Sequence, residues 1–153
     1  MNSVILPVNH IRQLKNGECV AACAAMVLTY LGVEANYFQL LKLLRITEIG
    51  TAFYHIRELE KLGVIVVYKQ GTLDEVHAHL SNNRPCIAAV KTKELPYFIE
   101  DTDHAVVIVG LDDQFVYLND PAITDAPQQV SRGDFLLAWI ERDELYATVM
   151  KRN

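Results

Sequence analysis

Apolar and polar residues fall in blocks along the first half of the chain, with lengths and spacings typical of helices. Residues 19–32 are almost uninterruptedly apolar and end at a glycine, which predicts a buried helix. Asn36 and Gln39 have the spacing of a capping box, so a second helix is expected over residues 36–45. A third helix is predicted over residues 51–62, again closed by a glycine.

Shorter runs rich in Val and Ile dominate the rest of the chain and are typical of strands. We expect strands over residues 64–68, 86–90, 104–110, 114–119 and 145–150. Two helices interrupt them: Thr72 and Glu75 form a second capping box that opens a helix to residue 82, and Ser131 is positioned to cap a further short helix. Residues 91–103 are polar and contain a proline, so they are expected to form a mobile loop.

Helices followed by an antiparallel sheet are the α+β pattern. The chain has 153 residues, the size of one compact domain, and it contains no repeat, linker or low-complexity tract. Residues 1–153 are therefore expected to form a single domain, with N-terminal helices packed on a C-terminal antiparallel sheet.

Composition narrows the functional classes. The formal charge is −5, whereas a nucleic-acid-binding protein normally carries a basic excess. The longest apolar run, residues 19–33, is shorter than the roughly 20 residues of a membrane-spanning helix, and no signal peptide precedes it. Three cysteines in such a chain favour reduced thiols, so we expect a cytoplasmic protein.

Cysteine, histidine, aspartate and glutamine residues form a candidate catalytic set. Cys19 lies at the start of the first predicted helix, where unpaired N–H groups and the helix dipole favour a thiolate. His104 begins one strand and Asp120 ends the next; in a hairpin these two ends are neighbours, and the histidine is expected to project from the rim of the sheet. Gln13, on the loop before Cys19, could donate to a developing oxyanion.

Each of these residues also has an ordinary structural explanation. A cysteine at an apolar helix start is usually a small core residue, and an aspartate before proline is a common turn residue. The joint order Gln13, Cys19, His104, Asp120 is what favours a catalytic interpretation. Other candidates are weaker. Cys23 and Cys86 are expected in the core, and His10 has no evident partner.

Three segments in this order resemble the bacteriocin-processing (double-glycine leader) cysteine peptidases, compact relatives of papain. Residues 13–23 (QLKNGECVAAC) are similar to the active-site helix of that family, residues 103–107 (DHAVV) to its histidine motif, and residues 119–122 (NDPA) to its aspartate motif. The resemblance spans nearly the whole chain. It departs at Val20, where transporter-linked members usually have glycine, and in this respect the chain looks more like free-standing members.

The resemblance implies a papain-like fold and a cysteine peptidase that works through an acyl-enzyme. Cys19 would be the nucleophile, His104 the base and acid, Asp120 the orienting carboxylate and Gln13 the oxyanion donor, with no cofactor and no metal. The expected partner is a peptide or protein substrate. Association with a transporter remains open, as do two other functions of the same fold: a non-catalytic peptide-binding module, and a transferase or deamidase using the same residues.

The loop before the histidine carries an unusual number of acidic residues. They are Glu94, Glu100, Asp101 and Asp103. A cationic substrate near the site and a merely solvated loop are both compatible with this stretch.

Overall fold

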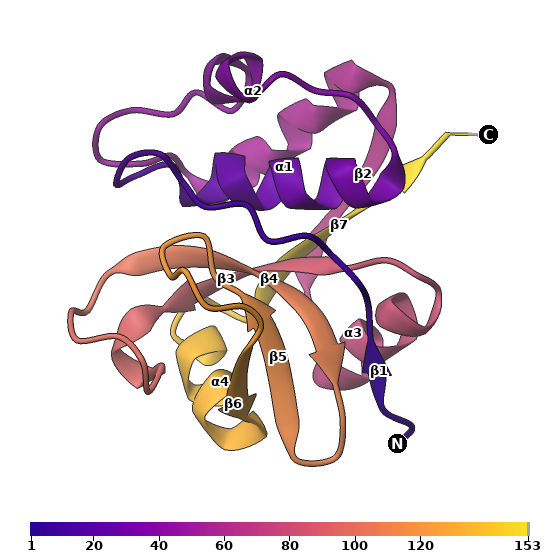
Figure 1. The fold of residues 1–153 in the computed structure, drawn as a ribbon, viewed down its shortest axis with the longest axis vertical. Coiled ribbons are helices and arrows are strands. Elements are labelled where there is room, and N and C mark those ends of the chain that lie inside the picture. Colours follow the sequence, from indigo (N-terminus) through magenta and orange to yellow (C-terminus); the bar gives the residue numbers. More distant parts are fainter. Residues whose placement is uncertain (153) are drawn as a thin grey trace.

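The computed structural model describes residues 1–152, and in it the helices cover both faces of one antiparallel sheet (Figure 1). The sheet has seven strands in the order β2-β7-β3-β4-β5-β6, with β1 paired to β4. The strands are β1 Val4–Ile5, β2 Val64–Gln70, β3 Cys86–Lys91, β4 Asp103–Leu111, β5 Phe115–Asn119, β6 Gln128–Ser131 and β7 Leu145–Lys151.

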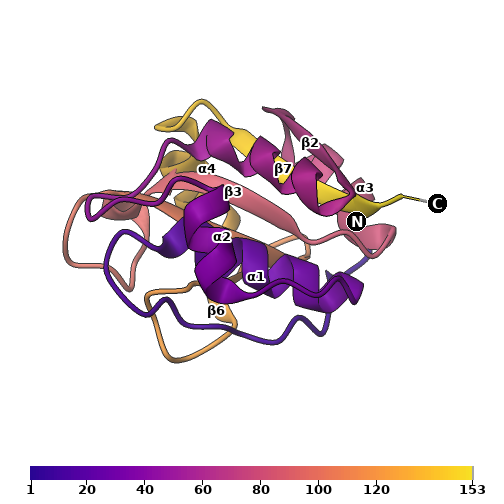
Figure 2. The same ribbon diagram turned by 90° about the horizontal axis from the view of Figure 1, so that it is seen from above.

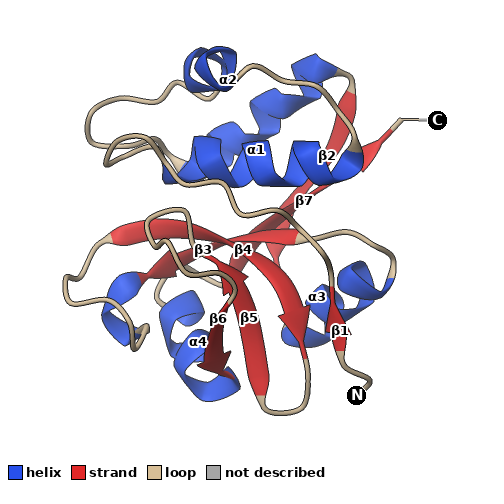
Figure 3. Cartoon of the chain, in the orientation of Figure 1, coloured by secondary structure: helices blue, strands red, loops and turns tan. Residues whose placement is uncertain are grey.

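The helices divide between the two faces of this sheet. On one side lie α1 (Cys19–Leu31), α2 (Tyr37–Leu43) and the 3-10 helix η1 (Phe53–Leu62). Figure 2 looks onto this side, and Figure 3 shows α3 (Leu73–Ser81) and α4 (Arg132–Ile140) on the other. The α+β class with N-terminal helices packed on an antiparallel sheet is confirmed.

Strands β3 and β4 are apolar at successive positions over residues 86–90 and 105–109 because these stretches are buried on both faces. In β3, Ile87 and Ala89 pack in the core under α1, whereas Ala88 and Val90 pack in the core under α3 and α4. The same alternation divides the residues of β4 between the two cores. This explains why residues 86–90 and 105–109 read as continuous apolar runs and not as alternating ones.

The predicted helix starts have the caps that the sequence indicates. Asn36 accepts hydrogen bonds from Phe38 N at 2.9 Å and Gln39 N at 3.3 Å. Thr72 accepts from Glu75 N at 3.2 Å, and Ser131 from Asp134 N at 3.1 Å. The predicted helix over residues 51–62 differs in kind, since it is a 3-10 helix that starts at Phe53.

The segment before β4, for which the polar sequence predicts a mobile loop, has regular structure and internal hydrogen bonds. It includes the 3-10 helix η2 (Thr92–Glu94) and the buried Leu95. Thr92 is fully buried, and its hydroxyl donates to Glu100 O at 2.6 Å and accepts from Thr102 N at 2.8 Å. The two ends of the segment are therefore tied together.

Two strands escaped the sequence analysis, β1 and β6. Each is short, and each gains its hydrogen bonds from a strand far away or across a long turn, so no local pattern marks it. Within residues 1–152, no helix is long and apolar enough to cross a membrane.

Candidate active site

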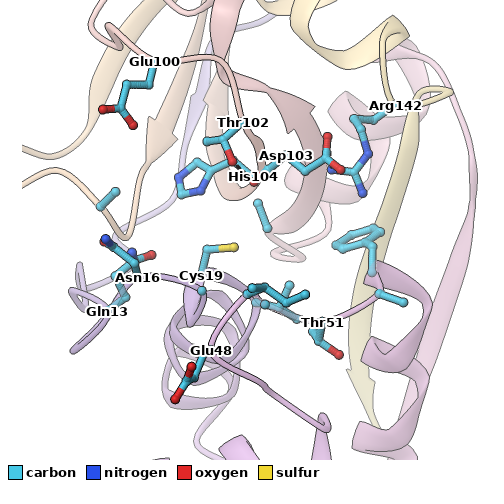
Figure 4. Close-up of a pocket in the computed structure, with 18 of the residues that line it drawn as sticks. Gln13, Asn16, Cys19, Glu48, Thr51, Glu100, Thr102, Asp103, His104 and Arg142 are labelled. Atoms are coloured by element: carbon cyan, nitrogen blue, oxygen red, sulfur yellow. Dashed lines mark hydrogen bonds and ion pairs between the residues drawn. The ribbon is translucent and has the colours of Figure 1, made fainter.

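A cleft opens between the start of α1 and the start of β4 (Figure 4). Its volume is about 490 Å³. The lining comes from five separated segments: the loop before α1 with the first two residues of that helix, the turn at residues 48–53, the segment at residues 98–105, Ala122 and Arg142. Cys19 and His104 both belong to this lining, and Figure 4 shows their side chains on facing sides of it.

Cys19 is the first residue of α1 and is partly exposed. The loop before it turns sharply at Gly17, whose φ is +88°. A Cβ at this position would lie 2.9 Å from Glu48 O and 3.0 Å from Gly50 N, so only glycine lets the two loops meet. Close contact between these loops fixes where α1 begins and therefore where the sulfur lies.

His104 is the second residue of β4 and forms one wall of the cleft. Only 7% of its surface is exposed, so the expectation of an imidazole projecting from the sheet rim is wrong. The ring of Phe98 packs against it edge-on, with centroids 5.2 Å apart, because the segment before β4 folds back over the histidine.

Asp120 follows β5 directly and is fully buried. Its Oδ1 lies 2.7 Å from Nε2 of His104, and the same oxygen accepts from Ala122 N at 2.9 Å. Pairing of Val107 with Asn119 brings the start of β4 beside the end of β5, as the hairpin argument predicts. The other oxygen, Oδ2, accepts the phenolic hydrogen of Tyr97 at 2.7 Å.

Gln13 reaches the cleft because the N-terminal segment runs alongside the chain that follows β5. Gln13 N donates to Pro121 O at 2.9 Å, and Asn119 Nδ2 donates to Val8 O at 2.9 Å. His10 Nε2 lies 2.7 Å from the carbonyl oxygen of Asp120, so this histidine has a partner that the sequence did not reveal. Gln13 Oε1 is buried without a hydrogen-bond partner.

The surroundings of His104 favour its protonated form. Burial by itself lowers the pKa of an imidazole, but hydrogen bonds to Asp120 and Cys19 and their negative charge outweigh it. The pKa of His104 is raised to about 9 as a result. The same carboxylate acts on Tyr97, whose pKa is raised by burial and by the charge of Asp120, so its hydroxyl remains a donor.

The other two cysteines lie in the core, as predicted. Burial raises the pKa of the Cys23 thiol well above its usual value, and that of Cys86 to about 12. Cys19 is the one cysteine of the described chain that is not buried. Among residues 1–152, no group of three or more His, Cys, Asp and Glu side chains is arranged to hold a metal ion.

All four predicted site residues thus meet at one cleft or directly behind it. Gln13, Cys19 and His104 line it, and Asp120 lies behind His104. Sequence reasoning missed Tyr97 and Arg142. A tyrosine in a polar loop and an arginine in a turn carry no local signal, because their place in the site depends on chain segments far from them in sequence.

Comparison with known proteins agrees with the fold. The model of the peptidase C39-like family matches residues 5–146. A candidate C39-like peptidase from Bacillus anthracis superposes with a TM-score of 0.83 at 19% identity, covering 100% of both chains. A search of curated proteins finds no match.

Two further solved structures are similar. The double-glycine motif protease of an AMS/PCAT transporter, solved in complex with the leader peptide, has a TM-score of 0.77 at 18% identity and covers 97% of this chain and 95% of its own. The peptidase domain of Streptococcus ComA, a bifunctional ABC transporter, has a TM-score of 0.77 at 18% identity, covering 95% and 99%. From the match over residues 5–146, the chain belongs to the peptidase C39-like family.

Proposed function

We propose that this protein is a cysteine peptidase that cleaves peptide bonds with Cys19 as its nucleophile. One observation carries the proposal: the buried 2.7 Å contact between His104 and Asp120 borders the same cleft as Cys19. Burying an ion pair of this kind costs free energy, and here His104 of the pair lines the cleft together with Cys19, the one cysteine of the described chain that is not buried.

The proposed reaction starts from a thiolate at Cys19 and an imidazolium at His104. With Nε2 of His104 engaged by Asp120, Nδ1 is the nitrogen left to exchange a proton with the sulfur. The raised pKa of His104, about 9, favours this charged pair near neutral pH. Asp120 keeps the ring oriented and stabilises its positive charge.

The thiolate then attacks the carbonyl carbon of the scissile peptide bond, and the carbonyl electrons move onto oxygen. The side-chain amide of Gln13 and the backbone N–H of Cys19 are the proposed donors to this oxyanion, each worth roughly 3 kcal/mol in comparable sites. The tetrahedral intermediate collapses, the C–N bond breaks, and His104 gives its proton to the leaving amine.

Water completes the cycle by attacking the thioester, with His104 accepting its proton. The carboxylic acid product leaves and the thiolate is restored. Peptide segments are the proposed substrates, in keeping with the leader peptide bound to the similar double-glycine motif protease. Supplying an amine acceptor tests the transferase alternative, since transfer would give an amide product in place of the acid.

The test combines thiol labelling with peptide cleavage. Iodoacetamide applied to the native protein should label Cys19 and leave Cys23 and Cys86 unlabelled, because both are buried. Cys19→Ala should abolish cleavage of a peptide mixture, and Cys86→Ala, a matched loss of one thiol remote from the cleft, should preserve it. Cleavage that survives Cys19→Ala would refute the proposal.

A further inference from the structure

Among residues 1–152, Arg142 is the one Lys or Arg side chain that lines the cleft. It lies in the tight turn between α4 and β7, where Arg142 N donates to Trp139 O at 2.9 Å. The next two residues, Asp143 and Glu144, both adopt left-handed backbone conformations, with φ of 59° and 53°. This turn delivers the arginine side chain to the cleft, and its side chain is only 22% exposed.

The guanidinium group has few partners inside the protein. Its Nη1 forms a long ion pair with Oδ1 of Asp103 at 3.7 Å, beyond hydrogen-bond distance, and the side chain donates no hydrogen bond within residues 1–152. Lys91 holds the same carboxylate oxygen more closely, at 3.2 Å. An arginine offers five N–H donors, so nearly all of the donors of Arg142 are left for a ligand in the cleft.

The other charged side chains of the cleft lining, apart from His104, are carboxylates. They belong to Glu48, Glu100 and Asp103; Figure 4 shows Glu48 and Glu100 away from Arg142, whereas Asp103 lies beside it. A peptide lying over the sulfur would therefore meet the guanidinium of Arg142 and its neighbour Asp103 on one side, and the carboxylates of Glu48 and Glu100 elsewhere in the cleft. Planar guanidinium groups bind carboxylates through paired hydrogen bonds, which makes Arg142 the specific element of this arrangement.

We propose that Arg142 binds a carboxylate of the peptide substrate, so that the protein selects peptides with Asp or Glu at one fixed position beside the scissile bond. The inference rests on the proposed peptidase function in one respect: that function is what places the bound carboxylate beside a scissile bond. Its physical basis is separate: a half-buried guanidinium with unused donors at a cleft wall.

A cleavage profile tests the selection. A defined mixture of synthetic peptides is incubated with the protein, and the cut sites are identified by mass spectrometry. The wild type should show Asp or Glu enriched at one position relative to the cut. Arg142→Gln should lower kcat/KM for these acidic peptides about tenfold, while peptides with Gln at that position change little.

Charge reversal sharpens the test. Arg142→Glu should move the preference at the same position from Asp or Glu to Lys or Arg. Lys91→Gln is the matched control, because it removes the other cation on Asp103 without changing the cleft lining, and its profile should equal that of the wild type. An Arg142→Glu profile identical to that of the wild type would overturn the inference while leaving the peptidase proposal intact.

A binding experiment separates the two proposals in the other direction. Immobilised Cys19→Ala protein, which cannot form an acyl-enzyme, is used to select peptides from the same mixture. Acidic peptides should be retained by Cys19→Ala and lost from the Cys19→Ala, Arg142→Gln double variant. If Cys19→Ala retains acidic peptides through Arg142 but the wild type cleaves none of them, the inference would be supported and the peptidase proposal refuted. Equal retention by the two variants would refute the inference.

Discussion

Tyr97 donates its hydroxyl hydrogen to Oδ2 of Asp120 at 2.7 Å, on the carboxylate oxygen that His104 does not use. Both oxygens of this fully buried side chain are therefore hydrogen-bonded, and the carboxylate plane is fixed from two sides. A buried carboxylate needs such partners, since an unpaired charge would be strongly destabilising. Tyr97 is thus a positioning residue for the proposed catalytic pair.

Tyr97→Phe is expected to destabilise the protein by about 1–3 kcal/mol, because one buried carboxylate oxygen loses its partner. The lowered stability should come with a fall in kcat greater than any change in KM, since the orientation of His104 loosens. Urea denaturation and steady-state kinetics measure the two effects. Tyr54→Phe, at an exposed tyrosine, is the control and should change neither. An unchanged kcat in Tyr97→Phe would contradict the positioning role.

The pH dependence of activity follows from the environment of His104. We expect kcat/KM to fall as pH rises through about 9, where His104 loses the proton that it must give to the leaving amine. Asp120→Asn removes the negative charge that raises the pKa of His104, so the alkaline limb should move to lower pH. NMR titration of the imidazole gives the same shift independently.

Asp120→Ala provides the comparison for this prediction. Asparagine still offers Oδ1 as an acceptor for His104, whereas alanine offers none, so Asp120→Asn should retain more activity than Asp120→Ala. The account would be contradicted if the alkaline limb of Asp120→Asn stayed at the pH of the wild type.

The amides of the segment before β4 are expected to exchange slowly with solvent where Thr92 ties its two ends together. Thr92→Val removes the hydroxyl that bridges Glu100 O and Thr102 N, at 2.6 and 2.8 Å. Amide exchange over residues 97–102 should accelerate, and stability should fall by about 1–3 kcal/mol. Thr29→Val, at an exposed position of α1, serves as the control. Fast exchange of this segment in the wild type would show that the sequence-based expectation of a mobile loop was right after all.

Gly17→Ala is expected to disturb the start of α1. The added methyl group would lie 2.9 Å from Glu48 O at a φ of +88°, which combines steric overlap with backbone strain. Stability should fall by more than the roughly 1 kcal/mol typical of glycine replacement at positive φ alone. Iodoacetamide labelling of Cys19 should change in rate as the sulfur moves.

Replacing two other glycines separates the effect of steric overlap from that of backbone strain. Gly63→Ala has the positive φ, +85°, but nothing within 4 Å of the added Cβ, so it measures strain alone. Gly133→Ala has neither and should be neutral or slightly stabilising. If Gly17→Ala cost no more than Gly63→Ala, the close approach of the two loops would not govern the position of Cys19.

Local chemistry made much of this fold predictable. The capping residues Asn36, Thr72 and Ser131 all act as the sequence indicates, since a cap needs only neighbours within three residues. The meeting of His104 with Asp120 was also predictable, because adjacent antiparallel strands joined by a short turn leave their outer ends side by side.

Long-range contacts made the rest unpredictable. The contact of His10 with Asp120 O joins residues 110 positions apart, and that of Tyr97 with Asp120 joins residues 23 apart. Arg142 reaches the cleft only because β7 inserts between β2 and β3 in the sheet. No periodicity or motif records such neighbours, which exist only once the whole sheet has assembled.

The most direct test of the central claim is to trap the acyl-enzyme. A peptide mixture is incubated with the protein, the reaction is quenched with acid, and the peptide that contains Cys19 is analysed by mass spectrometry. The account predicts a thioester adduct on Cys19 that accumulates in the wild type, forms much more slowly in His104→Ala, and is absent from Cys23 and Cys86. The account would be contradicted if the wild type cleaved peptides with no adduct on Cys19 in any quenched sample, and if His104→Ala cleaved them at the same rate.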